Sequence, residues 1–296
     1  MGLFNDYTDI EHKVKTEPRK LELSASIVIP FHYGYDILAK TVTSLTQQTY
    51  SKDRFEVIIA ADANHTNAKL ITEQYKKVLN IKLVTLSSSN GWGAASSRNA
   101  GIRVARNDVI VSLDADMICP PSFLESHMVW FHKSGKITTI GLKKFVKANR
   151  IQPRDIVRDF YSILSLPEIH SISNNVIGSR KDKRIPELDL LKIHPFPSNC
   201  FHGGNVAYWR DDALDIGLWD ETFNGNYGYE DIDFGQRLFE KGRKLVIEDY
   251  ATTYHQENKF VSRNERQKGL SINRTKLYEC YPALGRFRRD ILGSAQ

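Results

Sequence analysis

The sequence predicts an α/β fold, in which a mostly parallel β-sheet is flanked by helices within a single domain. From Ser26 onward, short apolar runs typical of buried strands alternate with longer segments of helical periodicity. Strands that alternate with helices are joined by right-handed crossovers and therefore pair in parallel. The chain has 296 residues, 41% apolar and 26% charged, which is ordinary for a globular protein with a substantial core.

The first half of the chain contains four apolar runs of strand length. They are SIVIPF (26–31), FEVIIAA (55–61), IKLVTL (81–86) and DVIVSL (108–113). Helical periodicity fills the intervals between them, at 37–48, 66–79 and 94–105. The polar residues before this region predict a loose N-terminal arm.

The second half is less regular. Residues 142–200 combine five prolines with polar and basic clusters, which indicates long loops and short helices. Regular patterns return in four segments: a strand at 203–209, a helix at 230–241, a strand at 244–249 and a helix at 262–280.

Composition excludes several classes of protein. No apolar stretch approaches the ~20 residues that span a bilayer, and the N-terminus lacks the apolar region of a secretory signal. The three cysteines are widely spaced, which predicts reduced thiols and a cytoplasmic protein. The net charge is +6, with basic clusters at 181–184, 263–268 and 285–289. These clusters are either a solvated surface or a contact for an anionic partner; nucleic acid is disfavoured because no aromatic-basic motif accompanies them.

Acidic residues follow two of the predicted strands. Asp62 comes after the run at 55–61, while Asp114 and Asp116 come after the run at 108–113. Ligands of parallel sheets bind beyond the carboxyl ends of the strands. Two neighbouring carboxylates there suit Mg²⁺ or Mn²⁺ shared with phosphate oxygens. The alternative is a loop pair that caps the following helix.

Six stretches, in this order and spacing, resemble the family 2 glycosyltransferases of the GT-A fold. They are SIVIPF, the Asp62 stretch, SSNGWGAASSRNAGI, LDAD, HGGNVAYW and WDETFNGNYGYEDIDFGQRL. The resemblance runs from about Ser26 to His255. The last block also resembles enzymes of the β4-galactosyltransferase and chondroitin polymerase type.

The resemblance implies a donor site on the first half of the chain. Pro30 and Phe31 fall where the first strand opens onto the nucleotide, and Asp62 accepts hydrogen bonds from the base or ribose. The family usually has two acids at this last position, whereas this chain has AADANH. Arg98 lies in a helix of small residues that approaches the nucleotide, and it pairs with a phosphate or an acid.

The metal and the donor sugar are assigned in the same way. Asp116 ligates the divalent ion and Asp114 contacts the ribose, or the ion through water. His255 completes the metal site and favours Mn²⁺ over Mg²⁺. The stretch Gly203, Gly204 and Asn205 leaves room for the donor sugar.

The acceptor side carries the catalytic group. The resemblance makes Asp231 the base that deprotonates an acceptor hydroxyl, and it makes Glu230 an acceptor-binding residue. Without the resemblance, both acids are equally explained by stabilisation at a helix N-terminus. Trp219 and Tyr229 are either a stacking wall for a sugar ring or part of the core.

The predicted function is an inverting, metal-dependent transfer of a single sugar from a nucleotide-diphosphate sugar, with UDP favoured, to a glycan, lipid-linked or protein acceptor. The Gln-x-x-Arg-Trp motif of processive members is missing. Residues 1–25 are then an arm, 26–141 the nucleotide-sugar half, 142–260 the acceptor and catalytic half, and 261–296 a basic helical extension compatible with peripheral contact to the inner membrane face.

Two other functions compete with this one. A sugar-1-phosphate nucleotidyltransferase needs a Gly-rich loop after its first strand, but PFHYGYDILAK has a single glycine. A non-catalytic carbohydrate- or nucleotide-binding protein of the same fold is the other alternative. The acids Asp114, Asp116 and Asp231, together with His255, argue against it.

Overall fold

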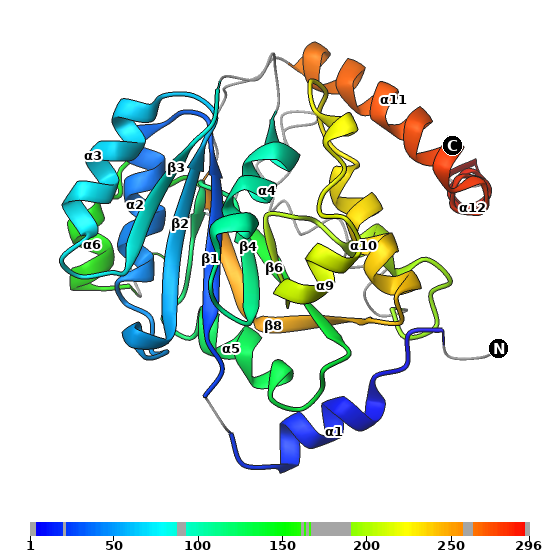
Figure 1. The fold of residues 1–296 in the computed structure, drawn as a ribbon, viewed down its shortest axis with the longest axis horizontal. Helices are drawn as coiled ribbons and strands as arrows, with labels where there is room; N and C mark the ends of the chain where they lie inside the picture. Colours follow the sequence, from blue (N-terminus) through cyan, green and yellow to red (C-terminus); the bar gives the residue numbers. More distant parts are fainter. Residues whose placement is uncertain are drawn as a thin grey trace.

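A single eight-stranded sheet forms the centre of the molecule in the computed structural model, which describes residues 4–19, 22–87, 93–160, 163, 166, 191–256 and 263–293. The strand order within these residues is β3-β2-β1-β4-β7-β6-β8-β5, and helices cover both faces (Figure 1). The strands are β1 (Ala25–Phe31), β2 (Phe55–Ala61), β3 (Ile81–Thr85), β4 (Val109–Leu113), β5 (Met117–Ile118), β6 (Ile137–Val146), β7 (Asn205–Trp209) and β8 (Lys244–Gln256).

The predicted mostly parallel α/β sheet is confirmed. Strands β1 to β4 pair in parallel, and so do β6 and β8. Strand β7 runs antiparallel between β4 and β6, and the short β5 pairs antiparallel with β8. The carboxyl ends of β1, β2 and β4 therefore lie at one edge, where ligands of such sheets bind.

Helices pack on the two faces of the sheet in separate layers (Figure 1). Helices α2 (Tyr35–Leu45), α3 (His65–Tyr75) and α6 (Pro153–Arg158) lie on one side, and α4 (Ala94–Val104), α9 (Arg210–Asp215) and α10 (Glu230–Glu240) on the other. Successive strand residues enter different cores: Ile27 and Ile29 join the first, whereas Val28 joins the second. The small-residue helix α4 comes very close to the sheet, because a side chain at Gly101 would collide with Val28.

Several elements differ from the sequence-based expectations. Strand β6 and helix α5 (Phe123–Phe131) were not anticipated, and the strand expected at 244–249 continues to Gln256. Helices α11 (Arg263–Cys280) and α12 (Pro282–Gly293) follow at the C-terminus. The basic cluster at 181–184 lies outside the described residues.

The N-terminal arm was expected to be loose, but it is held against the sheet. Residues Thr8–Thr16 form helix α1, and Asn5 before it is fully buried. The Asn5 amide Nδ2 donates to the Leu245 carbonyl oxygen (2.7 Å), and its Oδ1 accepts the Leu245 N–H (3.0 Å). This paired contact fixes the arm against the start of β8.

No helix in the described part of the chain is both long enough and apolar enough to cross a bilayer.

Candidate active site

Arg98 forms the centre of a buried cluster of charged residues. Its Nη2 donates to Asp114 Oδ1 (3.0 Å), and its Nη1 donates to Glu230 Oε1 (3.1 Å). The guanidinium also lies 4.5 Å from the centre of the Trp219 ring, in a cation–π arrangement. Arg98 comes from α4, Asp114 from the end of β4 and Glu230 from the start of α10. The cluster therefore joins two residues that the sequence predicted to bind the donor with one that it predicted to bind the acceptor.

Two groups of this cluster, Asp114 and Arg98, keep their charges despite burial. Burial opposes the charge of Asp114, but Lys143, Arg98 and His255 outweigh it and lower the pKa of this carboxyl. Burial also opposes the charge of Arg98, while the surrounding carboxylates raise its pKa. Asp114 therefore stays a carboxylate and Arg98 stays a cation.

The two acids at the start of α10 behave differently. Burial, reinforced by the negative charge of Asp231, raises the pKa of Glu230 to about 7. Burial also raises the pKa of Asp231. A carboxyl group whose pKa approaches the working pH is suited to accept a proton.

The residue before these acids, the helix cap Tyr229, has φ 74°, a left-handed conformation that costs a non-glycine residue about 1–2 kcal/mol.

Asp231 also contacts the glycine pair that follows His202. Its Oδ2 accepts the Gly203 N–H at 3.4 Å, and its Oδ1 accepts the Ile232 N–H at 2.9 Å. A carboxylate has about four lone-pair positions, so these two contacts leave acceptor capacity. Asp231 is thus held beside the stretch that the sequence assigns to the donor sugar.

Gly203 and Gly204 are required by the packing of the site itself. A Cβ atom at Gly203 would lie 2.7 Å from Trp219 and 3.3 Å from the Arg98 guanidinium carbon. A Cβ atom at Gly204 would collide with the Asp114 carboxylate. Their bare backbones therefore make space for the site's own side chains.

Asp116 and His255 come together where β5 pairs with β8. Met117 is opposite His255, and Asp116 Oδ2 lies 3.3 Å from His255 Nε2. Two ligands at about 2.1 Å from one divalent ion, at right angles to each other, are about 3.0 Å apart. This pair therefore fits two adjacent positions on a Mn²⁺ or Mg²⁺ ion. The described residues contain no group of three such side chains, so phosphate or water oxygens would fill the other positions.

The predicted donor residues at the ends of β1 and β2 also lie together. The Asp62 N–H donates to the Phe31 carbonyl oxygen (3.1 Å), and Pro30 precedes Phe31 in β1. Phe31 is buried in the core. Asp62 Oδ1 lies 2.8 Å from His32 Nδ1, so the carboxylate orients this imidazole.

Three predicted site residues lie deeper than expected. Asn205 is fully buried, and its amide donates to Leu142, Ala251 and Thr253, so it supports the site from behind. Trp219 is only 1% exposed because Phe234 covers one side of the ring (centroids 4.2 Å apart, interplanar angle 5°) and Arg98 covers the other. Tyr229 packs against a small apolar cluster around Phe223 and Ile232. The geometry favours the core interpretation of Trp219, whereas Tyr229 is only partly buried.

Two residues at the site were missed by sequence reasoning. Lys143 lies in β6, inside a region that appeared irregular, and its Nζ is 3.9 Å from Asp114 Oδ2. His32 directly follows the first strand and pairs with Asp62. Its position beside Phe31 was a usable signal for His32, whereas no motif marked Lys143.

Comparison with known proteins places this fold and site in a family. The protein-family model described as "Glycosyl transferase family 2" matches residues 26–207, and the family model described as "N-terminal domain of galactosyltransferase" matches residues 188–261. The chain belongs to the family 2 glycosyltransferases.

Its curated relatives include two bacterial chondroitin synthases. The one from Pasteurella multocida (strain Pm70) is 31% identical over 90% of this chain and 29% of its own length. The one from Escherichia coli is 31% identical over 78% of this chain and 34% of its own length. The chain thus spans about a third of the length of these relatives.

Solved structures share the fold at lower identity. GalNAc-T7 with UDP, GalNAc and Mn²⁺ has a TM-score of 0.60 at 19% identity, covering 80% of this chain and 44% of that one. The mannosyltransferase PcManGT from Pyrobaculum calidifontis, in complex with GDP-Man and Mn²⁺, has a TM-score of 0.58 at 15% identity, covering 92% and 70%. These likenesses show a GT-A-type glycosyltransferase fold.

Proposed function

We propose that this chain transfers a single sugar from a UDP-sugar to an acceptor hydroxyl, with inversion at the anomeric carbon and with a divalent metal ion. The observation that carries the proposal is the Arg98 cluster, which joins Asp114 on the donor side to Glu230 on the acceptor side. Asp231 lies next to Glu230 and contacts Gly203. A donor-binding residue and a candidate base therefore belong to one connected site.

In this proposal the donor lies across the carboxyl ends of β1, β2 and β4, in the nucleotide-sugar half at 26–141. Asp62, held by His32, accepts hydrogen bonds from the base or ribose. Asp114 contacts the ribose. The donor sugar lies beside Asp231, which accepts the Gly203 N–H, while Gly203 and Gly204 leave the space that Trp219, Arg98 and Asp114 occupy.

The reaction is a single displacement. The acceptor oxygen forms a bond to the anomeric carbon, the bond from that carbon to the phosphate oxygen breaks, and UDP leaves with the bonding electrons. Asp231 takes the proton of the acceptor hydroxyl, because burial raises its pKa and its carboxylate retains acceptor positions. Glu230 binds the acceptor beside it, in the half at 142–260.

Asp116 and His255 would hold the metal ion, and Mn²⁺ suits the imidazole–carboxylate pair better than Mg²⁺. When bound, the ion neutralises the diphosphate and stabilises its negative charge. The other contribution comes from the protein, because Arg98 orients Asp114 and Glu230.

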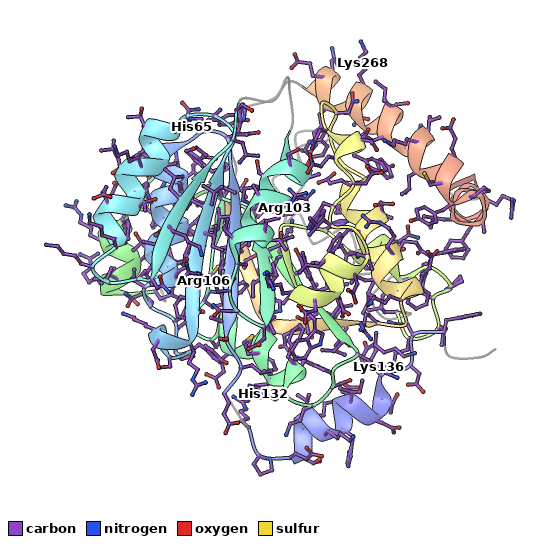
Figure 2. All side chains as sticks on the ribbon, viewed as in Figure 1. His65, Arg103, Arg106, His132, Lys136 and Lys268 are labelled. Atoms are coloured by element: carbon purple, nitrogen blue, oxygen red, sulfur yellow. The ribbon has the colours of Figure 1, made fainter. Side chains whose placement is uncertain are left out.

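A glycan is the acceptor that the relatives favour, since two of them are named chondroitin synthases. The basic helical extension at 261–296 is the second candidate contact. Arg266 and Lys268 are exposed on α11, where Figure 2 shows Lys268 directed away from the body of the protein. Such charges suit an anionic glycan or the headgroups of an anionic membrane.

Thermal unfolding with nucleotides tests the proposed donor site. UDP, GDP, CDP and dTDP would each be added with Mn²⁺ and, separately, with EDTA. A ligand that binds only the folded state stabilises it by about 2.7 kcal/mol at a hundredfold excess over its Kd. We expect stabilisation by UDP that disappears in EDTA. Stabilisation by another nucleotide instead of UDP would assign that nucleotide to the donor. If none of the four changes the unfolding temperature, the donor site is refuted.

A further inference from the structure

A break in the sheet lies directly beside the site. Strands β6 and β8 pair in parallel, but their register shifts between Gly141 and Lys143. Asn205 fills the break: its Nδ2 donates to the carbonyl oxygens of Leu142 (3.1 Å) and Ala251 (2.9 Å). The extra residues belong to β8, where residues 249–252 lie opposite Leu142 alone, and such bulges are frequent next to active sites.

A buried hydrogen-bonded network keeps Asn205 in this position. Asn205 Oδ1 lies 3.0 Å from His127 Nε2, and His127 Nδ1 lies 2.7 Å from Thr139 Oγ1. All three side chains are buried. A side chain at Gly141 would collide with the Asn205 amide. Fully satisfied networks of this kind rigidify the surrounding structure, so the bulge has a fixed shape.

Lys143 comes two residues after Gly141 on β6, so it lies on the same face of the strand, and its side chain points into the acid-lined site. Its Nζ lies 3.9 Å from Asp114 Oδ2 and 2.9 Å from the position that a Cβ atom at Gly204 would take. The Lys143 side chain is only 13% exposed. Its charge also reaches Asp231, whose ionised form it favours. By contrast, the next residue in the strand, Lys144, is exposed.

Lys143 and Arg98 are engaged differently. Arg98 donates directly to two carboxylates and lies over Trp219. Lys143 approaches Asp114 at a distance longer than a direct hydrogen bond. An ammonium group has three donors and binds phosphate as a compact point charge. A diphosphate that enters a site lined by Asp114, Asp116 and Asp231 needs such a charge in addition to a divalent ion.

We propose that Lys143 is a donor-binding residue whose ammonium group contacts the diphosphate of the sugar nucleotide, and that Asn205, by binding the Leu142 carbonyl, holds β6 in the position that presents it. This inference rests on the proposed function. It adds a contact to the phosphates from β6, whereas Asp116 and His255 lie where β5 pairs with β8.

Calorimetric titration of Lys143→Met with UDP and with uridine, in the presence of Mn²⁺, tests the proposal. A hydrogen bond to a charged group is worth roughly 1.5–3 kcal/mol, so UDP affinity should fall about 10- to 100-fold. Uridine affinity should change less than about twofold, because uridine carries no phosphate. Lys143→Arg, which keeps the charge, should recover part of the UDP affinity and guards against misfolding of the methionine variant.

Lys144→Met is the matched control, since it removes the same charge from the exposed neighbour on the same strand. It should bind UDP and uridine as the unaltered chain does. Equal losses for UDP and uridine in Lys143→Met would mean that Lys143 acts only through Asp114, and would overturn the proposal. Unchanged UDP affinity would overturn it as well. If the unaltered chain itself binds no UDP with Mn²⁺, the proposed function fails, and this inference fails with it.

Discussion

Asn273 Nδ2 donates hydrogen bonds to the carbonyl oxygens of Gly228 (2.8 Å) and Phe223 (3.0 Å), and its side chain is buried. Helix α11 thereby holds the loop that leads directly into Glu230 and Asp231. Gly269 on the same helix allows this contact, because a Cβ atom there would lie 2.7 Å from the Tyr227 nitrogen. The C-terminal extension therefore supports the start of α10, where Glu230 and Asp231 lie.

Replacing Asn273 by alanine should reduce both stability and activity. Leaving buried carbonyl groups without their donor costs about 1–3 kcal/mol, and the loop before Glu230 loses its support. Urea unfolding and sugar transfer would be measured together. Arg274→Ala, on the exposed side of the same helix, should change neither. Full activity in Asn273→Ala would show that α11 does not position the acids.

Gly204 should tolerate no side chain. A Cβ atom there would collide with the Asp114 carboxylate, so Gly204→Ala must displace Asp114 from Arg98. We expect UDP affinity to fall at least about tenfold, since a charged hydrogen bond is worth roughly 1.5–3 kcal/mol. Gly135→Ala is the control, because nothing lies within 4 Å of its added Cβ atom. Normal UDP binding by Gly204→Ala would contradict the placement of Asp114.

Stability should fall in mild acid because of His127. Burial lowers the pKa of His127 from 6.5 to about 4, so between these values the unfolded chain binds a proton that the folded chain does not. The contribution of neutral His127 is complete above about pH 6.5 and is lost at about 1.4 kcal/mol per pH unit as the pH falls toward 4.

Urea unfolding of His127→Gln between pH 7 and pH 4.5 measures this effect. The substitution removes the titrating group while keeping an amide near Thr139 and Asn205, so the dependence of stability on pH should flatten. His12→Gln, on the exposed side of α1, should retain the full slope. An unchanged slope in His127→Gln would assign the pH dependence to other groups.

The parts of the fold that repeat a regular pattern were predictable from the sequence. The four strands of the first half and α4 follow from apolar runs and small residues, and the observed bounds differ from the predicted ones by only a few residues. Strand β6 was missed because it covers both a core and an active site, so KKF at 143–145 breaks the apolar pattern. The resemblance assigned Arg98 and Asp114 to the donor and Glu230 to the acceptor, and the structure supplies the contacts among them.

Other features depend on tertiary contacts and carry no sequence signal. The buried state of Trp219 follows from Phe234 and Arg98, which lie on both sides of its ring. The position of Lys143 depends on Asn205, which reaches from β7 to hold the Leu142 carbonyl on β6. Neither contact is local in the chain, so periodicity and motif spacing do not reveal them.

The central claim is that Asp231 is the catalytic base of a sugar transfer. The most direct measurement compares UDP binding and transfer rate in the unaltered chain, in Asp231→Asn and in the control Asp211→Asn, whose side chain is exposed on α9. General-base catalysis contributes about 10²- to 10⁴-fold, so Asp231→Asn should lose that much rate while UDP affinity stays within about twofold. Transfer at an undiminished rate in Asp231→Asn would contradict the account.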